Sequence, residues 1–309
     1  MIVTTIVGGD PDAALALAVI ALTEPALTLV ITAEESFDHR RARFAAHLLD
    51  LLGRSDVRVV PGRCRDSGRY RPPTSRHWAA RGLTPGDIEV GGRDHCGAYD
   101  AVAQVYRDHP GETVRFFNAA PLTVLAHLLA LDQVAVRPLR LRSSLEIQQG
   151  GGSFTDHPEA RFRTDGAAAR SVLLTVANMR LVLAETCSAL PGLDSGGPMH
   201  RAFVESPHPW GRLMLAHLEQ WWHISAPTAN HLTDTIAATT ALGCDFVEFR
   251  RTAFVVGDYG RLIAGIGDRR SPVSISLNID RFSGWLLDIA SRRDGGGSLA
   301  ANAAVAQAG

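Results

Sequence analysis

The sequence contains no lysine, and its 31 Lys+Arg positions are therefore all arginines. This absence excludes chemistry that needs a lysine amine, namely Schiff-base formation and the lysine of a phosphate-binding P-loop. The charges of the chain are also nearly balanced, with a formal net charge of −1. No basic excess therefore predicts binding to nucleic acid or to an acidic membrane surface.

Cysteine is scarce, and long apolar runs are missing. The four cysteines, at positions 64, 96, 187 and 244, form no Cys-x-x-Cys pair, so neither a disulfide framework nor a zinc site is indicated. No apolar run reaches the length of about 18 residues that a membrane span needs, and no basic segment precedes an apolar run as in a signal peptide. We therefore expect a soluble, cytoplasmic protein with reduced thiols.

What the sequence does contain is an alternation of short β-branched runs with Ala/Leu/Arg segments of helical period. Beyond the first strand and helix, the runs predict strands at 26–32, 57–60, 113–118 and about 139–148, with helices at 40–52, at 98–109 and from about residue 121. This rhythm predicts an α/β fold with a mostly parallel, Rossmann-like open sheet and helices on both faces.

The domain organisation follows from the same pattern. A chain of 309 residues with 46% hydrophobic residues can bury a large core, and we place a single domain at 1–291. The tail at 292–309 is rich in small residues, and we expect it to be flexible. The irregular, Arg/Pro/Ser/Gly-rich segment at 63–92 is long enough for a mobile lid.

The stretch from Val3 to Leu17 contains the first candidate functional residues. It combines a β-branched strand, a Gly-Gly turn, the loop Asp10-Pro11-Asp12 and an Ala/Leu helix. Ligands of open α/β sheets bind where strands end and helices begin, so Asp10 and Asp12 are expected at the mouth of a site. The alternative is that one of the two carboxylates only caps the helix.

Five segments, in order and spread over nearly the whole chain, resemble the nucleoside hydrolases of the inosine/uridine-preferring type. They are ITAEESFDHRRARFAAHLLDLLGRSDVRVVPG, AYDAVAQVYRDHPGETVRFFNAAPLTVLAHLLALD, RFRTDGAAARSVL, HLTDTIAATTAL and VSISLNIDRFSGWLLDIAS. Members of that family cleave the N-glycosidic bond of ribonucleosides. The resemblance implies the family's fold, a small nucleoside-like substrate and a homo-oligomer, either a dimer or a tetramer.

The resemblance also implies a calcium ion, which in the family is held by carboxylates of the first loop. In the ungapped register the two calcium aspartates fall on Gly8 and Ala13, and Asp12 falls on the position that binds the ribose 2-hydroxyl. A local shift would recruit Asp10 instead.

Two further positions of the calcium site match the family, namely Thr123 and Asp234. The weak candidates for metal ligands are therefore Asp10, Asp12, Thr123 and Asp234. Because calcium takes 6 to 8 oxygen ligands, this set is incomplete, and we expect no cofactor.

Other positions differ from the family in the same region. Glu35 replaces the ribose-binding asparagine after the second strand, and Arg161 replaces the asparagine that precedes the family's Asp-Pro-Glu-Ala-Ala segment. Glu159 matches the acid of that segment, and Thr233 replaces the histidine proposed to assist the leaving base. His231 lies two residues away from that position, which on a helix start directs it elsewhere.

These replacements suggest an electrostatic exchange at the site. The carboxylates of Asp12, Glu35, Glu159 and Asp234 would repel one another without a cation. We hypothesise that Arg161 supplies the positive charge and bridges two of the acids, since its planar guanidinium can bind two carboxylates. The alternative is that Arg161 points to solvent, like its neighbour at position 163.

Two functions therefore remain open. The first is an N-glycosyl hydrolase or related glycosyl-transforming enzyme with a rebuilt, metal-poor site. Its predicted catalytic residues are Asp12, Glu35 and Asp234, and its predicted substrate-binding residues are Asp10, Asp12, Glu159, Arg161 and Thr233. The second is a catalytically inactive homologue that binds a nucleoside-like ligand or a partner protein.

Overall fold

A single sheet organises the chain. The computed structural model describes residues 1–33, 39–62, 96–176, 178–188, 193–224, 232–267 and 270–291. The predicted catalytic Glu35, the predicted lid at 63–92, His231 and the tail at 292–309 lie outside these described residues. The structure therefore leaves those four predictions as they stand, together with the single-domain boundary at 291.

Nine strands of the described residues form the sheet, in the order β3-β2-β1-β4-β5-β6-β9-β7-β8. Neighbouring strands are parallel from β3 to β9, whereas β7 is antiparallel to β9 and β8 is antiparallel to β7. The strand bounds are β1 Ile2–Thr5, β2 Leu29–Thr32, β3 Arg58–Pro61, β4 Val114–Ala119, β5 Leu145–Gly150, β6 Met179–Val182, β7 Val247–Val256, β8 Leu262–Ala264 and β9 Arg270–Leu277. The predicted α/β fold with a mostly parallel sheet is confirmed.

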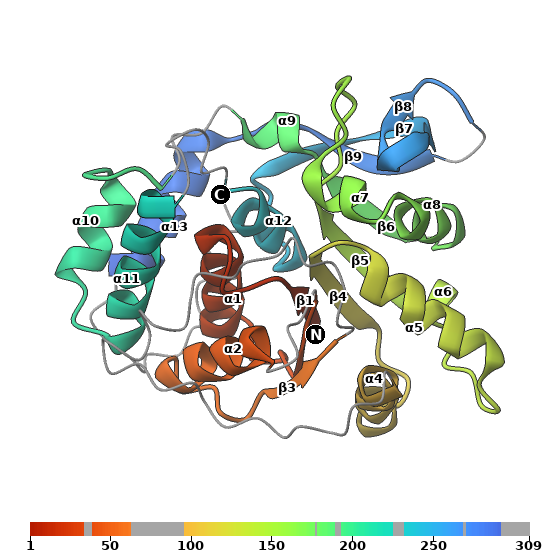
Figure 1. Cartoon of the computed structure of the whole chain (residues 1–309), viewed down its shortest axis with the longest axis horizontal. Helices are drawn as coiled ribbons and strands as arrows, with labels where there is room; N and C mark the ends of the chain where they lie inside the picture. The colour runs from red at the N-terminus through yellow and green to blue at the C-terminus, as the bar shows by residue number, and fades with distance from the viewer. Residues whose placement is uncertain are drawn as a thin grey trace.

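Helices cover both faces of the sheet, as predicted (Figure 1). Successive strand residues such as Ile2 and Val3 belong to different hydrophobic cores, because side chains alternate across a sheet. The first core is formed with α1 Pro11–Thr23, α2 Arg40–Leu51, α10 Pro198–Glu205, α11 Pro209–Ile224, α12 Thr233–Ala241 and α13 Ile279–Ser291. The second is formed with α4 Cys96–Asp108, α5 Thr123–Val134, α6 Leu141–Ser144, α7 Ala160–Thr164 and α8 Gly166–Thr175. The short helices α9 (Ala184–Cys187) and η1 (Asp258–Gly260) complete the set.

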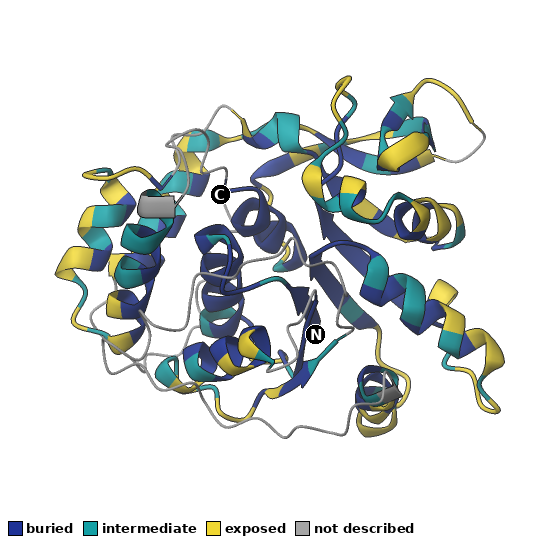
Figure 2. Cartoon of the chain, viewed as in Figure 1, coloured by how far each residue is buried: buried dark blue, intermediate teal, exposed yellow. Residues whose placement is uncertain are grey.

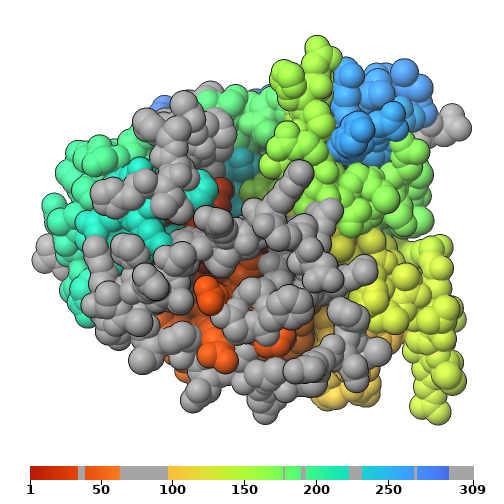
Figure 3. Space-filling view, in the orientation of Figure 1, coloured from red at the N-terminus to blue at the C-terminus, as the bar shows by residue number. Residues whose placement is uncertain are grey.

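Burial follows this layered arrangement. The central strands and the helices α1 and α12 are almost wholly buried, whereas the outer helices expose one side (Figure 2). On the face seen in Figure 3, α10 and α11 lie at the opposite end of the molecule from β7 and β8. In the described ranges, every helix is too short or too polar to cross a membrane.

One predicted strand is wrong in its first half. The expected strand at about 139–148 begins only at Leu145, and a helical turn, α6, precedes it. The buried carboxylate of Asp132 accepts hydrogen bonds from the backbone N–H groups of Leu139 (2.6 Å) and Leu141 (2.8 Å). Between them Arg140 has a left-handed backbone with φ of 58°. The carboxylate therefore folds the chain into a turn that its alternating leucines do not indicate.

The strand order reverses between β1 and β4, which are neighbours in the sheet although they are far apart in the chain. In open α/β sheets the crevice at such a reversal, beside the carboxyl ends of the strands, is where ligands bind. The loop after β1 lies at this edge, and it contains both Asp10 and Asp12.

Candidate functional site

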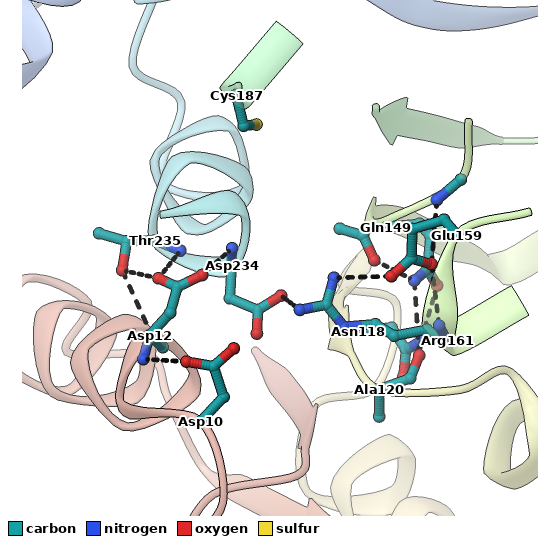
Figure 4. A network of polar contacts seen from close by, with 12 residues as sticks. Asp10, Asp12, Asn118, Ala120, Gln149, Glu159, Arg161, Cys187, Asp234 and Thr235 are labelled. Atoms are coloured by element: carbon teal, nitrogen blue, oxygen red, sulfur yellow. Dashed lines mark hydrogen bonds and ion pairs between the residues drawn. The ribbon is translucent and has the colours of Figure 1, made fainter. Parts of the chain in front are cut away.

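Three segments far apart in the sequence bring charged side chains together at this edge (Figure 4). Asp10 and Asp12 follow β1, Glu159 and Arg161 follow β5, and Asp234 lies in the first turn of α12. Helix α12 packs against α1 and against β5, which places its N-terminus beside the loop after β1. The predicted site residues that the structure describes therefore come from adjoining segments, including Thr123, which begins α5 after β4.

Asp10 begins helix α1. Its Oδ1 accepts a hydrogen bond from the Asp12 N–H at 3.0 Å, and Pro11 occupies the first helical position. One of the two carboxylates, that of Asp10, therefore caps the helix, as the alternative interpretation of this loop predicted. The Asp10 residue is half-buried, so part of it remains exposed to solvent.

Asp12 is buried and caps a helix to which it does not belong. Its Oδ2 accepts from the Asp234 N–H at 2.7 Å, and its Oδ1 accepts from the Thr235 N–H at 3.0 Å and the Thr235 hydroxyl at 2.6 Å. The first N–H groups of a helix have no partner inside the helix, so these bonds satisfy donors that burial would otherwise leave unpaired. Asp12 thus fastens α1 to the N-terminus of α12.

Glu159 caps helix α7 and fixes the glycine turn after β5. Its Oε2 accepts from the N–H groups of Arg161 (3.0 Å), Phe162 (3.3 Å) and Gly152 (3.4 Å). At Gly151, where φ is +120°, a Cβ atom would lie 2.9 Å from Glu159 Oε2. Glycine is therefore required here both by the backbone conformation and by the approach of the carboxylate.

Arg161 bridges two acids, as hypothesised. One terminal nitrogen lies 2.8 Å from Asp234 Oδ1, and the other lies 3.6 Å from Glu159 Oε1. Only 11% of the Arg161 side chain is exposed, and the Asp234 side chain is fully buried. The alternative that Arg161 points to solvent is wrong, although Arg163, one half-turn further along, is exposed.

The charges of the cluster remain only partly matched. Burial raises the pKa of Asp12 to about 7, with repulsion from Asp10 adding to the rise. Burial likewise raises the pKa of Asp234 well above its ordinary value, while the Arg161 guanidinium opposes the rise. Within the described part of the chain, neither carboxylate oxygen of Asp234 accepts a hydrogen bond, and neither does Arg161 Nε donate one. The site therefore holds buried polar atoms without hydrogen-bond partners.

This donor set does not fit a calcium ion. Both oxygens of Asp12 are occupied by donors, and Asp234 faces a guanidinium. Thr123 was expected to contribute its backbone carbonyl, and its hydroxyl donates to Asp165 Oδ2 at 2.8 Å, at the start of α8, which leaves that carbonyl unaffected. No group of three or more His, Cys, Asp or Glu side chains with the arrangement of a metal site occurs among the residues that the structure describes. We therefore derive no catalytic step through calcium, and the absence of a cofactor stays a prediction.

Three further buried polar residues lie near the cluster, and only one of them was predicted from the sequence. Thr233, a predicted substrate-binding residue, begins α12 and is buried beside Cys187, whose thiol pKa burial raises to about 12. The buried amides of Asn118 and Gln149 were not anticipated. Asn118 donates to Gln149 Oε1 at 2.6 Å and to the Ala120 carbonyl at 2.7 Å, at the ends of β4 and β5. The available signal was an amide side chain at the next-to-last position of both β4 and β5.

Side chains of two other helices, α2 and α11, hydrogen-bond to the loop after β1. These contacts were not predicted from the sequence. The buried Arg41 of α2 donates to the carbonyl oxygens of Ile6 and Val7. The buried His217 of α11 lies with its Nε2 3.0 Å from the Gly9 carbonyl oxygen, to which it donates. Burial lowers the pKa of His217 to about 4, so this imidazole is neutral at pH 7.

The low pKa of His217 predicts that this residue destabilises the fold in mild acid. An unfolded histidine takes up its proton near pH 6.5 and the folded one only near pH 4, so the unfolded chain binds one proton more between these values. The contribution of His217 to the free energy of unfolding should therefore fall by about 1.4 kcal/mol per pH unit as the pH drops from 6.5 to 4, whereas Asp12 and Asp234, whose pKa values are raised, contribute with the opposite sign. Urea denaturation across this range measures the slope.

His217→Gln removes the titrating group and keeps a donor for the Gly9 carbonyl. Relative to the wild type, its free energy of unfolding should rise as the pH drops over the same range, because the unfavourable contribution of His217 is absent. The exposed His157→Gln variant is the matched control and should follow the wild-type profile. Parallel profiles for His217→Gln and the wild type would contradict the prediction.

Comparisons with known proteins agree with this architecture. No protein-family model and no curated protein sequence matches the chain. Among solved structures, a purine-preferring ribonucleoside hydrolase from Gardnerella vaginalis matches with a TM-score of 0.72 and 19% identity, over 94% of this chain and 98% of its own. An inosine-uridine preferring nucleoside hydrolase from Bacillus anthracis matches with a TM-score of 0.70 and 16% identity over the same shares.

A third solved structure belongs to a protein with a different description. The type III effector XopQ, complexed with adenosine diphosphate ribose, matches with a TM-score of 0.61 and 17% identity, over 94% of this chain and 92% of its own. At identities this low, the likeness shows the fold alone. The fold of the chain is that of the nucleoside hydrolases, and the resemblance detected in the sequence is confirmed at this level.

Proposed function

We propose that this protein cleaves the N-glycosidic bond of a nucleoside-like small molecule without a divalent cation. The observation that carries the proposal is the ion pair of 2.8 Å between Arg161 and Asp234, at the ligand-binding edge of the sheet. A guanidinium here supplies a fixed positive charge to acids that calcium would otherwise neutralise. The nucleoside hydrolases that share the fold make a nucleoside-like ligand the natural expectation.

The reaction can be carried by carboxylates. In hydrolysis, the oxygen of water bonds to the anomeric carbon, the C–N bond breaks, and its electron pair leaves with the base. One carboxylate takes the proton of the attacking water, and the oxocarbenium-like transition state is stabilised by nearby negative charge. We assign this role to Asp234 because, apart from its ion pair with Arg161, its carboxylate accepts no hydrogen bond from the described residues.

The remaining roles follow from how each side chain is occupied. Asp12 is held by three donors, which supports a positioning role at α12 as well as the predicted contact with a ribose hydroxyl. Glu35 remains the proposed partner of Asp12 in acid–base catalysis. Asp10, Glu159, Arg161 and Thr233 remain the proposed substrate-binding residues. We further propose a cytoplasmic homo-oligomer, either a dimer or a tetramer, with a single domain at 1–291 and a flexible tail at 292–309.

A second candidate function is a catalytically inactive protein that binds a nucleoside-like ligand or a partner protein. It is favoured by the hydrogen bonds that Asp12 and Glu159 accept from backbone N–H groups, because such carboxylates are engaged in holding helices. XopQ, which shares the fold, was solved with adenosine diphosphate ribose. A ligand containing a ribose is therefore compatible with either function.

A nucleoside panel assayed with and without metal separates these possibilities. Purified protein is incubated with purine and pyrimidine ribonucleosides in calcium chloride or in excess EDTA, and base release is followed by absorbance. We expect release at rates that agree within about twofold between the two conditions, since Arg161 replaces the metal charge.

A calcium-dependent nuclease in the same buffers shows that chelation is complete. Release that EDTA abolishes and calcium restores would overturn the metal-independent site. Binding without release, measured by calorimetry, would favour the second function. Neither binding nor release would refute both functions for nucleosides.

A further inference from the structure

The connection between α5 and α6 exposes two apolar side chains to water. Val134, the last residue of α5, is 79% exposed, and Val136 in the loop that follows is 99% exposed. Figure 3 shows the yellow-green end of α5 and this loop projecting from the body of the molecule. Water surrounds a valine in such a position on almost every side, so its burial against another surface would be favourable.

The exposure is part of the folded structure, because hydrogen bonds hold the loop on both sides. The buried carboxylate of Asp132 accepts from two backbone N–H groups of the loop and from the Tyr99 hydroxyl at 2.9 Å. On the α6 side, the Tyr106 hydroxyl lies 2.8 Å from Ser144 Oγ. Folding the valines back onto the second hydrophobic core would break these bonds. The apolar side chains are therefore held outward.

The charged side chains that this connection exposes are all positive. Arg137, Arg140 and Arg142 are exposed, and none of them forms an ion pair with another described residue. The one acidic residue between positions 123 and 145 is Asp132, which is buried. We call residues 134–142 the basic tip. The net charge of −1 is a sum over the whole chain, and it does not describe this segment.

The basic tip lies far from the ligand-binding crevice. Helix α5 begins at Thr123, after the carboxyl end of β4, and its 12 residues carry the chain about 18 Å away from that edge. The short helix α6 then leads directly into the first residue of β5, Leu145. The tip is therefore at the edge where the parallel strands begin. A surface bound there leaves the crevice at the opposite edge open.

An anionic lipid bilayer matches both chemical properties of the tip. Its headgroup region takes up small apolar segments, and its phosphate groups accept charge-assisted hydrogen bonds from guanidinium groups. A projecting tip enters a deformable lipid surface without further adjustment, whereas a protein partner would need a pocket of matching shape. The combination of exposed valines with unpaired arginines on one projection therefore favours a bilayer over an acidic protein.

We propose that the basic tip docks this protein on membranes that contain anionic phospholipids. Val134 and Val136 enter the headgroup region, and the arginines at 137, 140 and 142 bind lipid phosphates. The inference goes beyond the reaction proposed for the crevice and does not depend on it. Docking through the tip holds the protein at the membrane surface while the crevice faces away from the lipid.

Vesicle sedimentation with the full-length protein tests the proposal. Vesicles of phosphatidylcholine alone are compared with vesicles in which phosphatidylserine replaces one third of the lipid. We expect binding to the anionic vesicles to be at least about tenfold tighter, because each arginine near an anionic surface contributes about fivefold. The difference should shrink as salt is raised.

The double variant Val134→Ser/Val136→Ser tests the apolar part of the contact. Its affinity for the anionic vesicles should fall about fivefold or more, because two side chains no longer leave water on binding. Val204→Ser is the matched control, since Val204 is 57% exposed on α10, and it should change the affinity less than about twofold. The replaced side chains are exposed, so the urea midpoints of these variants should match the wild type.

Arg137→Glu tests the electrostatic part. Its affinity for the anionic vesicles should fall about tenfold or more, since one positive charge is lost and one negative charge is added. Arg43→Glu makes the same change of charge at an exposed position of α2, which covers the other face of the sheet. That control should change the affinity less than about twofold.

The results can overturn the proposal in three ways. Equal binding to both kinds of vesicle, or no binding to either, would refute an anionic lipid partner. Binding that Arg137→Glu weakens and the valine replacements do not would indicate a purely electrostatic contact, such as an acidic protein makes, and would refute the inserted tip. A change of oligomeric state in the valine variant, measured by sedimentation velocity, would assign the tip to a second copy of this chain instead. Loss of vesicle binding in both tip variants, with both controls unchanged, supports the proposal.

Discussion

Replacing Arg161 with methionine lowers the free energy of unfolding by about 3–5 kcal/mol, the usual result of removing one partner of a buried ion pair. The fully buried Asp234 would then keep a negative charge without the guanidinium 2.8 Å away, and Glu159 would lose the same neighbour. Urea denaturation near pH 7.5 measures the change.

Arg163→Met is the matched control for this variant. Arg163 belongs to the same short helix but is exposed, so its replacement should change stability by less than about 0.5 kcal/mol. Asp234→Asn added to Arg161→Met should restore more than half of the lost stability, because the uncompensated charge is removed. Equal losses in Arg161→Met and Arg163→Met would show that the bridge contributes nothing to the fold.

The second large effect is expected at Asp12. Asp12→Ala removes the acceptor of three donors at the start of α12, all from Asp234 and Thr235. Each unpaired buried donor costs about 1–3 kcal/mol. The variant no longer incurs the desolvation cost of burying the Asp12 carboxyl group, which offsets part of this loss. We therefore expect the free energy of unfolding to fall by about 3 kcal/mol.

Two comparison variants define the origin of that loss. Thr235→Val removes only the hydroxyl donor and should cost about 1 kcal/mol. Asp280→Ala removes an exposed acid from the first turn of α13 and should change stability by less than about 0.5 kcal/mol. If Asp12→Ala is no worse than Asp280→Ala, the tie between α1 and α12 is not a source of stability.

The fold could be predicted from the sequence because its signals are local. Strands such as β1 are short runs of β-branched residues, and a glycine or proline turn follows each run. The start of α1 is indicated by Asp10 as the N-cap and by Pro11 at the first helical position. The strand expected from residue 139 is wrong for a reason that is not local. Asp132 reaches forward to Leu139 and Leu141, and its partners cannot be read from hydrophobic alternation.

The site could be predicted in part. Arg161 was expected to bridge acids because its charge stands among carboxylates, and this arrangement is found. That Asp12 caps α12 could not be foreseen, since its donors lie 222 and 223 residues further along the chain. The contacts of Arg41 and His217 with the first loop could not be predicted from the sequence either, because each joins a side chain to a backbone carbonyl in a distant segment. The roles of Glu35 and of the segment 63–92 remain predictions.

The bond between Asp12 and the N-terminus of α12 has a consequence for biosynthesis. A ribosome adds Asp234 222 residues after Asp12. Throughout that interval the nascent chain has no α12 to hold the carboxylate. The contact between Asp12 and α12 can therefore form only after α12 has been synthesised, and an amino-terminal fragment that stops before α12 would carry Asp12 without its hydrogen-bond donors.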